Sequence, residues 1–285
     1  MTLPSLTLLG QSILSGLFIG ALYGLLGLGL SLSWGMLRQI NLAHFALAFL
    51  GAYLTYQLSS TAGFDPLLTL LLVAPGFFVL GMAMHWVFAR FEVSPFNSLL
   101  VTFGLTVIIE SGIQWIWTAD YRKLETHYAD IKYKIGVLYV PLPELLTLLI
   151  SVALAAGTWA VLRYTHVGKA MRAMSEDAAM ASAFGVNERL LALLLSGASA
   201  AFAGVAGVCL ALSFTLAPAQ IYTWIGVVFA AVMIGGLGNP LGPLIAGIVI
   251  GVSESLTMAV TAPAWAPLVS FSLLILVLLF RPGKL

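Results

Sequence analysis

Long apolar stretches alternate with short polar ones along the whole chain. Nine apolar stretches approach the roughly 20 residues that a helix needs to cross a bilayer. The pattern predicts membrane helices at about 11–33, 43–59, 66–89, 98–118, 143–163, 188–213, 223–237, 243–260 and 265–281. Two polar gaps are longer than the rest, 119–142 and 164–187. We therefore expect an all-α fold, a polytopic transmembrane bundle of about 8–9 membrane segments forming one domain over residues 1–285.

Composition supports a lipid environment. The chain is 61% hydrophobic and 8% charged, whereas a soluble domain has about 25% charged residues. Mean hydropathy is +1.05. The first apolar stretch is too long for the core of a signal peptide and is read as the first membrane helix. The single cysteine, Cys209, lies in an apolar run and is expected to be a small core residue.

The distribution of basic residues predicts the orientation, because short cytoplasmic loops are enriched in Lys and Arg. With nine crossings, eight of the twelve basic residues fall on one side, which includes segment 164–187 and the C-terminus. The other four lie in 119–142. We expect 164–187 and the C-terminus to be cytoplasmic and 119–142 to be external. The eight are Arg38, Arg90, Arg163, Lys169, Arg172, Arg189, Arg281 and Lys284.

Segment 164–187 has the composition of an ordered helix and not of a flexible linker. It carries Lys169, Arg172, Glu176 and Asp177, and Gly185 closes it. Apolar side chains are available for contact at Met171, Met174, Met180 and Phe184. A polar helix with methionines suits a partner's groove. We predict an eighteen-residue docking helix at 168–185; the alternative is a helix that lies on the membrane surface.

Glycines and broken helices form a second pattern. Small residues four apart, at Gly16, Gly20 and Gly24 and again at Gly247 and Gly251, allow close helix packing in lipid. Polar residues interrupt an apolar run at 34–44, and glycines and prolines interrupt another at 235–243. Two such interruptions in matching positions of two halves indicate a transport site and an inverted repeat. The alternative is that both are ordinary cytoplasmic turns.

A few polar side chains lie inside apolar helices. Charges in the membrane are costly and should face the bundle interior. Glu110 and Gln114 share one helix face, Glu254 follows the second break, and His44 lies one turn after Asn41. Substrate contact and interhelical hydrogen bonding both explain Glu110 and Glu254, whereas His44 is expected to face a cavity. His85 is expected at the membrane interface.

Motifs for chemistry are missing from the sequence. It has no phosphate-binding G-x-x-x-x-G-K-[ST] loop, no metal-ligand spacing and no nucleophile motif. We predict no catalytic residue, no metal and no cofactor in this chain.

Three ordered motifs nevertheless resemble one family. Ile40–Tyr53 (INLAHFALAFLGAY), Tyr164–Asn187 (YTHVGKAMRAMSEDAAMASAFGVN) and Ile234–Leu256 (IGGLGNPLGPLIAGIVIGVSESL) are similar to segments of bacterial permeases for branched-chain amino acids, urea and short amides. The closing FSLLILVLLFRPGKL is similar to their last helix. The chain most resembles the first of the two permease subunits of such systems.

The resemblance implies an ATP-binding-cassette importer in the bacterial inner membrane. Its partners would be a second permease subunit, two cytoplasmic ATPases that bind the ATP, and a periplasmic solute-binding protein. Segment 164–187 would hold the coupling helix, centred on Ser175 to Phe184, and 119–142 would be periplasmic. The residues expected at the coupling site are Lys169, Arg172, Ser175, Glu176, Asp177, Phe184 and Gly185; those expected along the solute pathway are Asn41, His44, Phe45, Glu110, Gln114, Asn239 and Glu254.

One position departs from the family pattern. Relatives carry His-Gly-Glu where this chain has His44, Phe45 and Ala46. If the site lines the pathway, the solute is expected to be more apolar or aromatic; if the family carboxylate is structural, the change says nothing about the solute. The alternatives for the whole chain are a sugar- or nucleoside-type permease of a related importer, an ion-coupled transporter and a channel. Pairing with an identical or a different permease chain stays open.

Overall fold

Helices make up nearly all of the structure. The computed structural model describes residues 5–280; Arg281 and Lys284, which entered the orientation argument, lie outside this range. Two short strands, β1 and β2, and three 3-10 turns complete it. The elements are α1 Leu6–Leu37, α2 Ala43–Ala62, α3 Leu70–Arg90, α4 Pro95–Trp117, η1 His127–Asp130, β1 Lys132–Ile135, β2 Leu138–Pro141, α5 Leu142–Tyr164, α6 His166–Glu176, α7 Ala178–Ala183, α8 Glu188–Ser213, η2 Pro218–Gln220, α9 Ile221–Gly235, α10 Gly242–Val260, η3 Pro263–Trp265 and α11 Ala266–Phe280.

Each of the nine predicted membrane segments corresponds to a long helix, which confirms the polytopic helical bundle. Eight of these helices are long and apolar enough to cross a membrane. The ninth, α2, ends in polar residues, and Ala43–Tyr53 is buried inside the protein except at Leu50. A helix surrounded by protein needs less hydrophobicity than one that faces lipid.

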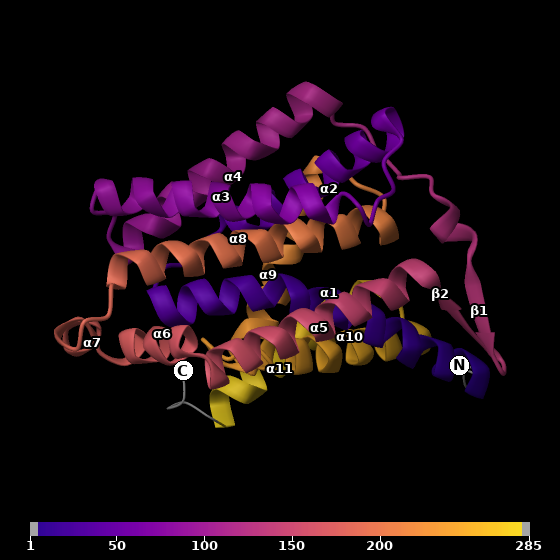
Figure 1. The fold of residues 1–285 in the computed structure, drawn as a ribbon. Helices are drawn as coiled ribbons and strands as arrows, with labels where there is room; N and C mark the ends of the chain where they lie inside the picture. The colour runs from indigo at the N-terminus through magenta and orange to yellow at the C-terminus, as the bar shows by residue number, and fades with distance from the viewer. Residues whose placement is uncertain (1–4, 281–285) are drawn as a thin grey trace.

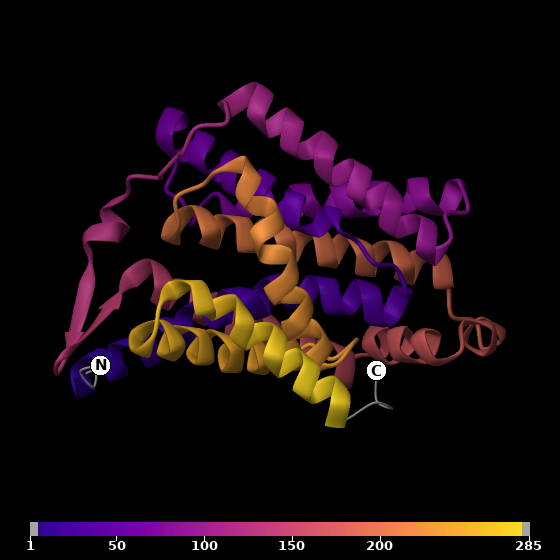
Figure 2. The ribbon, with the colours of Figure 1, turned by 180° about the vertical axis from the view of Figure 1, so that it is seen from behind.

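The long helices run alongside one another between two distinct ends (Figure 1). The β1–β2 hairpin lies at one end, together with the N-terminus of α1, and is called the hairpin end. The short helices α6 and α7 lie at the other, called the α6–α7 end. In the view from behind, α9 crosses between α4 and α11 (Figure 2).

The helices form two halves of opposite direction. α1 packs most extensively on α10, and α3 packs most extensively on α8. One half is α1–α4 and the other is α8–α11. In each pair, the first helix of one half contacts the third helix of the other half. α1 runs towards the α6–α7 end, whereas α8 runs away from it (Figure 1). This reciprocal packing is the arrangement expected of an inverted repeat.

The two breaks found in the sequence are not the matching positions, contrary to the prediction. Residues 38–42 join the first and second helices of one half, whereas residues 236–241 join the second and third helices of the other. Both breaks adjoin the end of α1: the Gly238 N–H donates to the Ser31 carbonyl oxygen, about two turns before the end of this helix, at 3.0 Å, and residues 38–42 follow it. The connection between the first and second helices of the other half, which corresponds to 38–42, is 214–220 between α8 and α9, at the hairpin end.

Glycines let α1 and α10 pack backbone to backbone, as their spacing predicted. A methyl group added at Gly16 would lie 2.5 Å from the Cα of Val252. One added at Gly20 would lie 2.5 Å from the Gly247 carbonyl oxygen and equally close to the Cα of Ile248. No larger residue fits at these positions without separating the helices.

The polar segment 119–142 is more structured than predicted, since it contains η1 and the hairpin. The Gln11 side-chain amide pairs with both backbone polar groups of Tyr139, at 2.9 and 3.0 Å, and fixes the hairpin to α1. The Tyr128 hydroxyl donates to Asp65 at 2.6 Å, between α2 and α3. This hydrogen bond to the charged form holds the pKa of Asp65 below its usual value.

The α1–α10 contact gives a first prediction. Gly20→Ala should destabilise the protein by about 1–3 kcal/mol through overpacking. In the matched control Gly112→Ala, no atom lies within 4 Å of the added methyl group, so stability should be unchanged or raised. Thermal unfolding of the detergent-purified chain compares the two, and equal stability of both variants would contradict this role for Gly20.

Candidate functional site

The break between α1 and α2 is anchored on α4. Arg38 takes a left-handed conformation at φ 54° and ends α1. The Leu42 N–H donates to Thr102 Oγ1 at 3.1 Å, and this hydroxyl lies 3.3 Å from the Ile40 carbonyl oxygen. Asn41 Oδ1 is buried and has no hydrogen-bond partner among the described residues. Thr102 therefore supplies a polar group for irregular backbone, which must be satisfied within the protein in a membrane.

His44 and Phe45 pack inside the bundle in this structure. His44 is fully buried, and its Nε2 lies 2.9 Å from the Leu26 carbonyl oxygen of α1. Its ring also lies against Gly29. Phe45 stacks on Phe229 of α9, with centroids 6.2 Å apart. These contacts connect the start of α2 to α1 and α9; neither residue lines the cavity beside α6 and α7 or the one beside Glu254 that are described below.

The second break closes on α1 through Ser31. The Gly238 N–H donates to Ser31 Oγ at 3.1 Å, and the Ser31 hydroxyl lies 3.2 Å from the Gly236 carbonyl oxygen. Asn239 is exposed and accepts from the Leu241 N–H at 3.1 Å. Asn239 thus stabilises its own turn, and the two breaks form one irregular layer at the α6–α7 end.

Glu254 of α10 connects three helices from both halves of the bundle. It is 7% exposed and accepts hydrogen bonds from the Tyr23 hydroxyl of α1, at 3.0 Å, and from the Ser270 hydroxyl of α11. It also borders a cavity of about 230 Å³. Both interpretations from the sequence therefore have support: Glu254 forms interhelical hydrogen bonds, and it also borders a cavity that a solute could contact. The polar residues that line this cavity are Ser15, Tyr23, Glu144, Thr147, Ser213, Glu254 and Ser255.

Glu110 and Gln114 form a separate polar cluster with Tyr222. The Tyr222 hydroxyl of α9 donates to Glu110 at 2.6 Å, and the Gln114 amide donates to the other carboxylate oxygen at 3.2 Å. Gln114 is exposed and Glu110 half-buried, on the side of the molecule where α9 crosses between α4 and α11 (Figure 2). The neighbouring Val107 and Ile108 of α4 are exposed and apolar.

The predicted pathway residues therefore lie in three places. Asn41, His44, Phe45 and Asn239 are in or beside the two breaks, with His44 and Phe45 inside the bundle, Glu254 is between α1, α10 and α11, and Glu110 and Gln114 are on α4. Sequence reasoning missed the hydroxyl partners Tyr23, Thr102, Tyr222 and Ser270. Single hydroxyl residues in apolar helices are common, and nothing in their spacing shows which carboxylate they reach.

Segment 164–187 folds as two short helices, so the predicted single eighteen-residue helix is wrong. α6 ends at Glu176, and the Asp177 side chain accepts from the Met180 N–H at 2.9 Å to begin α7. An Asp side chain at such a position favours a new helix start over continuation. Gly185 then ends the segment in a left-handed conformation, at φ 87°.

The apolar residues of this segment divide into an inner and an outer set. Met171 and Met174 are buried against Leu32 and Met36 of α1, so they are not available to a partner as predicted. Met180 and Phe184 are 58% and 83% exposed. The charged Lys169, Arg172 and Glu176 are exposed as well. Two large apolar side chains, on α7 and directly after it, are therefore exposed, and α7 lies at one tip of the molecule (Figure 1).

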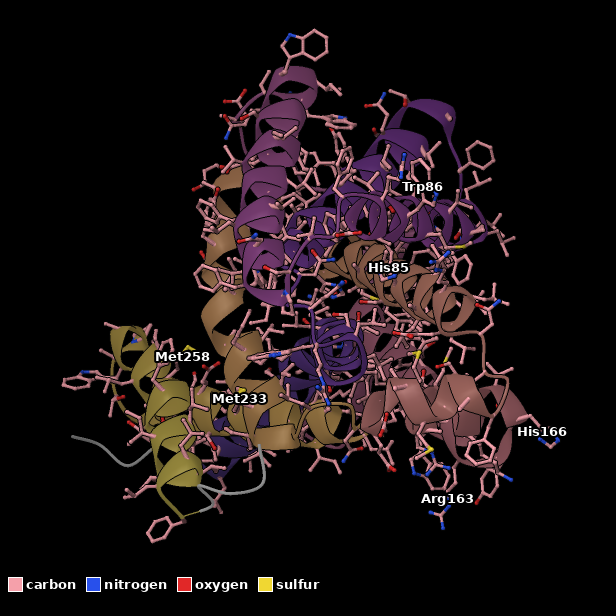
Figure 3. The ribbon with its side chains drawn as sticks, turned by 90° about the vertical axis from the view of Figure 1, so that its left-hand side faces the viewer. His85, Trp86, Arg163, His166, Met233 and Met258 are labelled. Carbon is pink, nitrogen blue, oxygen red and sulfur yellow. The ribbon has the colours of Figure 1, made fainter. Side chains whose placement is uncertain are left out.

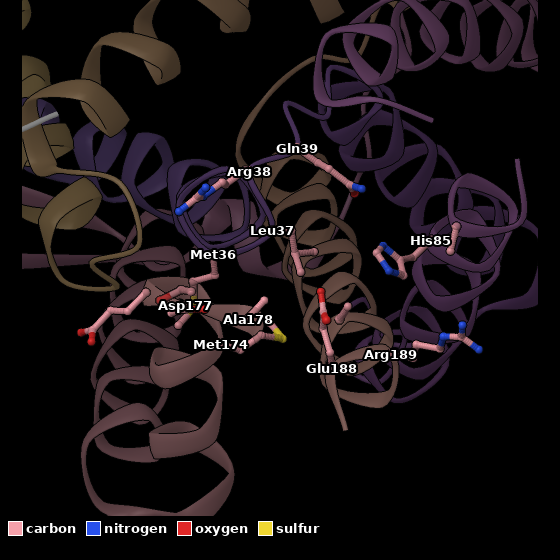
Figure 4. A pocket seen from close by; sticks show the side chains of 14 residues that line it. Met36, Leu37, Arg38, Gln39, His85, Met174, Asp177, Ala178, Glu188 and Arg189 are labelled. Atoms are coloured by element: carbon pink, nitrogen blue, oxygen red, sulfur yellow. The ribbon is translucent and has the colours of Figure 1, made fainter. Parts of the chain in front are cut away.

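An open cavity of about 520 Å³ lies beside α6 and α7. Ser175, Glu176 and Asp177 line it, with charged and polar groups from α1, α3 and α8 opposite. Figure 4 shows His85 and Glu188 facing this space from two helices. His85 is buried near the end of α3, and its Nδ1 lacks a hydrogen-bond partner in the described structure.

A bundle of opposed halves, with broken helices, buried polar groups and a projecting helical element, defines the class of membrane transport subunits. Comparison with known proteins specifies the family. The family described as "Branched-chain amino acid transport system / permease component" matches residues 12–278. The chain belongs to this family of ATP-binding-cassette permease subunits and is a multi-pass inner-membrane protein, not an enzyme.

Curated relatives agree with this assignment. The high-affinity branched-chain amino acid transport system permease protein LivH of Salmonella typhimurium is 28% identical over 302 residues, covering 95% of this chain and 93% of the relative. Permease protein BraD of Pseudomonas aeruginosa is 25% identical, with 95% and 94% covered. No solved structure matches the chain. The comparisons give no support to a sugar- or nucleoside-type permease, an ion-coupled transporter or a channel.

The Glu254 cluster gives a second prediction. Glu254→Ala should lower stability by about 1–3 kcal/mol, because the hydroxyls of Tyr23 and Ser270 lose their acceptor. The control is Ser253→Ala, one residue away, whose hydroxyl bonds only to the Val249 carbonyl oxygen of its own helix. Thermal unfolding of both purified variants tests this, and a Glu254→Ala protein as stable as the control would show that the cluster is not a structural tie.

Proposed function

We propose that this chain moves a small amino-acid-like solute inward by alternating access, as half of the membrane pathway of an importer. Membership of the permease family supports the transport role, and the names of the relatives suggest an amino acid with an apolar side chain. The observation that carries the pathway is the Glu110–Gln114–Tyr222 cluster, a carboxylate on an otherwise apolar outer face.

A carboxylate at this position needs an environment other than lipid. Placing an acidic side chain in the hydrocarbon costs about 2.5–3.5 kcal/mol on insertion scales. Glu110 has hydrogen-bond donors but no described cation beside it. We infer that the side of the molecule with α4 and α9 faces a second permease subunit, with a wet pathway between them. The Glu110 carboxylate there suits the ammonium group of an amino acid.

The other predicted residues have a place in the same proposal. Asn41, His44, Phe45 and Asn239 lie in or beside the two breaks, and inside the bundle Phe45 and Phe229 connect α2 to α9. Glu254 links α1, α10 and α11. These are the contacts that would rearrange when the pathway changes the side on which it opens.

The α6–α7 end would be cytoplasmic and bind an ATPase. Six of the eight basic residues of the predicted inner side are described, and they lie at this end, as the positive-inside rule requires. Met180 and Phe184 would enter a groove of the ATPase, flanked by Lys169, Arg172, Ser175, Glu176 and Asp177, with Gly185 setting the turn. The second permease subunit, a second ATPase and a solute-binding protein at the hairpin end complete the assembly. ATP would bind to the ATPases only.

Removal of the charge at Glu110 tests the pathway. Glu110→Gln should reduce uptake about tenfold or more, since a charged contact is worth about 1.5–3 kcal/mol. ATPase subunits should still co-purify. The control is Ser111→Ala, at an exposed residue next to Glu110, which should leave uptake unaltered. Uptake of radiolabelled leucine by reconstituted vesicles measures both variants. Full uptake by Glu110→Gln would remove this residue from the pathway.

Truncation of Phe184 tests the docking surface. Phe184→Ala should weaken ATPase binding by about 2 kcal/mol or more, as for a central aromatic residue of an interface. Phe91→Ala is the matched control, because Phe91 is similarly exposed, at 75%, in another connection at the same end. Co-purification of tagged permease with its ATPases measures both. If the two variants retain the ATPases equally, α7 is not the docking element.

A further inference from the structure

A basic and aromatic cluster lies where α5 ends. We define the Arg163 cluster as Trp159, Arg163, Tyr164 and His166. The Arg163 guanidinium carbon lies 5.1 Å from the Trp159 ring centroid and 5.8 Å from that of Tyr164. The two aromatic rings meet edge to face at 5.7 Å. An exposed arginine is thus held between two rings with its hydrogen-bond donors available.

The joint between α5 and α6 makes this cluster rigid. The Thr165 hydroxyl donates to the Val161 carbonyl oxygen at 2.7 Å and accepts from the Gly168 N–H at 3.0 Å. Gly168 packs so closely on the backbone of Val161 and Leu162 that a side chain there would clash. The first turn of α6 is therefore locked on the last turn of α5, and His166 keeps a fixed position relative to Arg163.

The cluster points sideways from the bundle. Figure 3 looks at the α6–α7 end, and in it Arg163 and His166 project from the outline of the molecule, away from the other helices. α5 is one of the candidate membrane spans, so its last turn lies where the bilayer ends. Trp and Tyr are enriched at that depth. In a membrane, the cluster would therefore lie at the depth of the lipid headgroups.

The charge around the end of α5 and the start of α6 is positive, and the first acidic residues that follow are Glu176 and Asp177 at the end of α6. Arg163, Lys169 and Arg172 lie in a stretch, residues 145–175, that contains no acidic residue. Lys169 is exposed on α6, three residues after His166. A planar guanidinium binds phosphate oxygens in a bidentate manner, and its position on the aromatic rings leaves this edge free.

We propose that the Arg163 cluster binds the headgroup of an anionic phospholipid. The guanidinium of Arg163 and the imidazole of His166 contact the lipid phosphate, while Trp159 and Tyr164 lie beside the upper acyl chain and glycerol. The bound lipid holds the start of α6 at the membrane surface. This site does not depend on the solute or on the ATPase contact, and it is separate from the exposed tip of α7.

Native mass spectrometry of the full chain, titrated with phosphatidylglycerol or phosphatidylcholine, tests the site. The wild type should retain phosphatidylglycerol preferentially. Arg163→Gln should weaken this binding about fivefold, the effect of about 1 kcal/mol per basic residue near an anionic surface. Arg163→Lys should restore part of it. The control Arg90→Gln removes an exposed charge at the same end, in the last turn of α3 close to Glu92, and should change binding less than twofold.

Three results would overturn the proposal. The first is equal retention of the two lipids by the wild type. The second is a loss of phosphatidylglycerol binding that is the same for Arg163→Gln and Arg90→Gln. The third is an Arg163→Gln variant that binds lipid normally but loses ATPase co-purification, which assigns the residue to a protein contact. Size-exclusion chromatography verifies folding of each variant, and Arg163→Lys provides the comparison if Arg163→Gln fails to fold.

Discussion

The backbone contact between α1 and α10 is the interaction on which the rest of the structure depends. Helices in lipid gain no hydrophobic energy from meeting, so close van der Waals packing must hold them together. Gly16 and Gly20 on α1 and Gly247 and Gly251 on α10 provide it. The same device recurs where α8 meets α3, since a side chain at Gly81 would clash with Ser196 and Ala200. Two glycine-lined seams thus connect the opposed halves.

Polar groups specify how the remaining helices sit against these seams. Glu254 accepts hydrogen bonds from hydroxyl groups of α1 and α11. The hydroxyl of Thr102 links α4 to the first break, and the His44 ring is hydrogen-bonded to the backbone of α1. In a membrane each such group must find a partner inside the protein, so its position constrains the helix that carries it. Glu110 differs, because its only described partners are Tyr222 and Gln114 and the cluster remains on the outside.

The sequence predicts the helices well, because a membrane requires about 20 apolar residues for each crossing and leaves few alternatives. It also predicts close packing at the glycine repeats. It does not reveal that the repeat around Gly20 meets the one around Gly247, because those residues lie far apart in the chain. The pairing of Glu254 with Tyr23 was hidden for the same reason. The restart of the helix at Asp177 was missed because the surrounding alanines and methionines all favour helix, and a single capping side chain decided the outcome.

The packing of α6 shows how a force on α7 would reach the membrane helices. Met171 and Met174 of α6 belong to a buried apolar cluster that includes Leu28, Leu32 and Met36 of α1 and Leu191 and Leu195 of α8. α1 and α8 are the helices that carry the two seams, and Glu254 of α10 and His44 of α2 are hydrogen-bonded to α1. Because close-packed interiors transmit displacement with little compression, movement of α6 would shift both halves relative to each other. The methionines expected to contact a partner are therefore packed inward on the bundle, which leaves Met180 and Phe184 as the apolar groups of this segment through which a partner would move it.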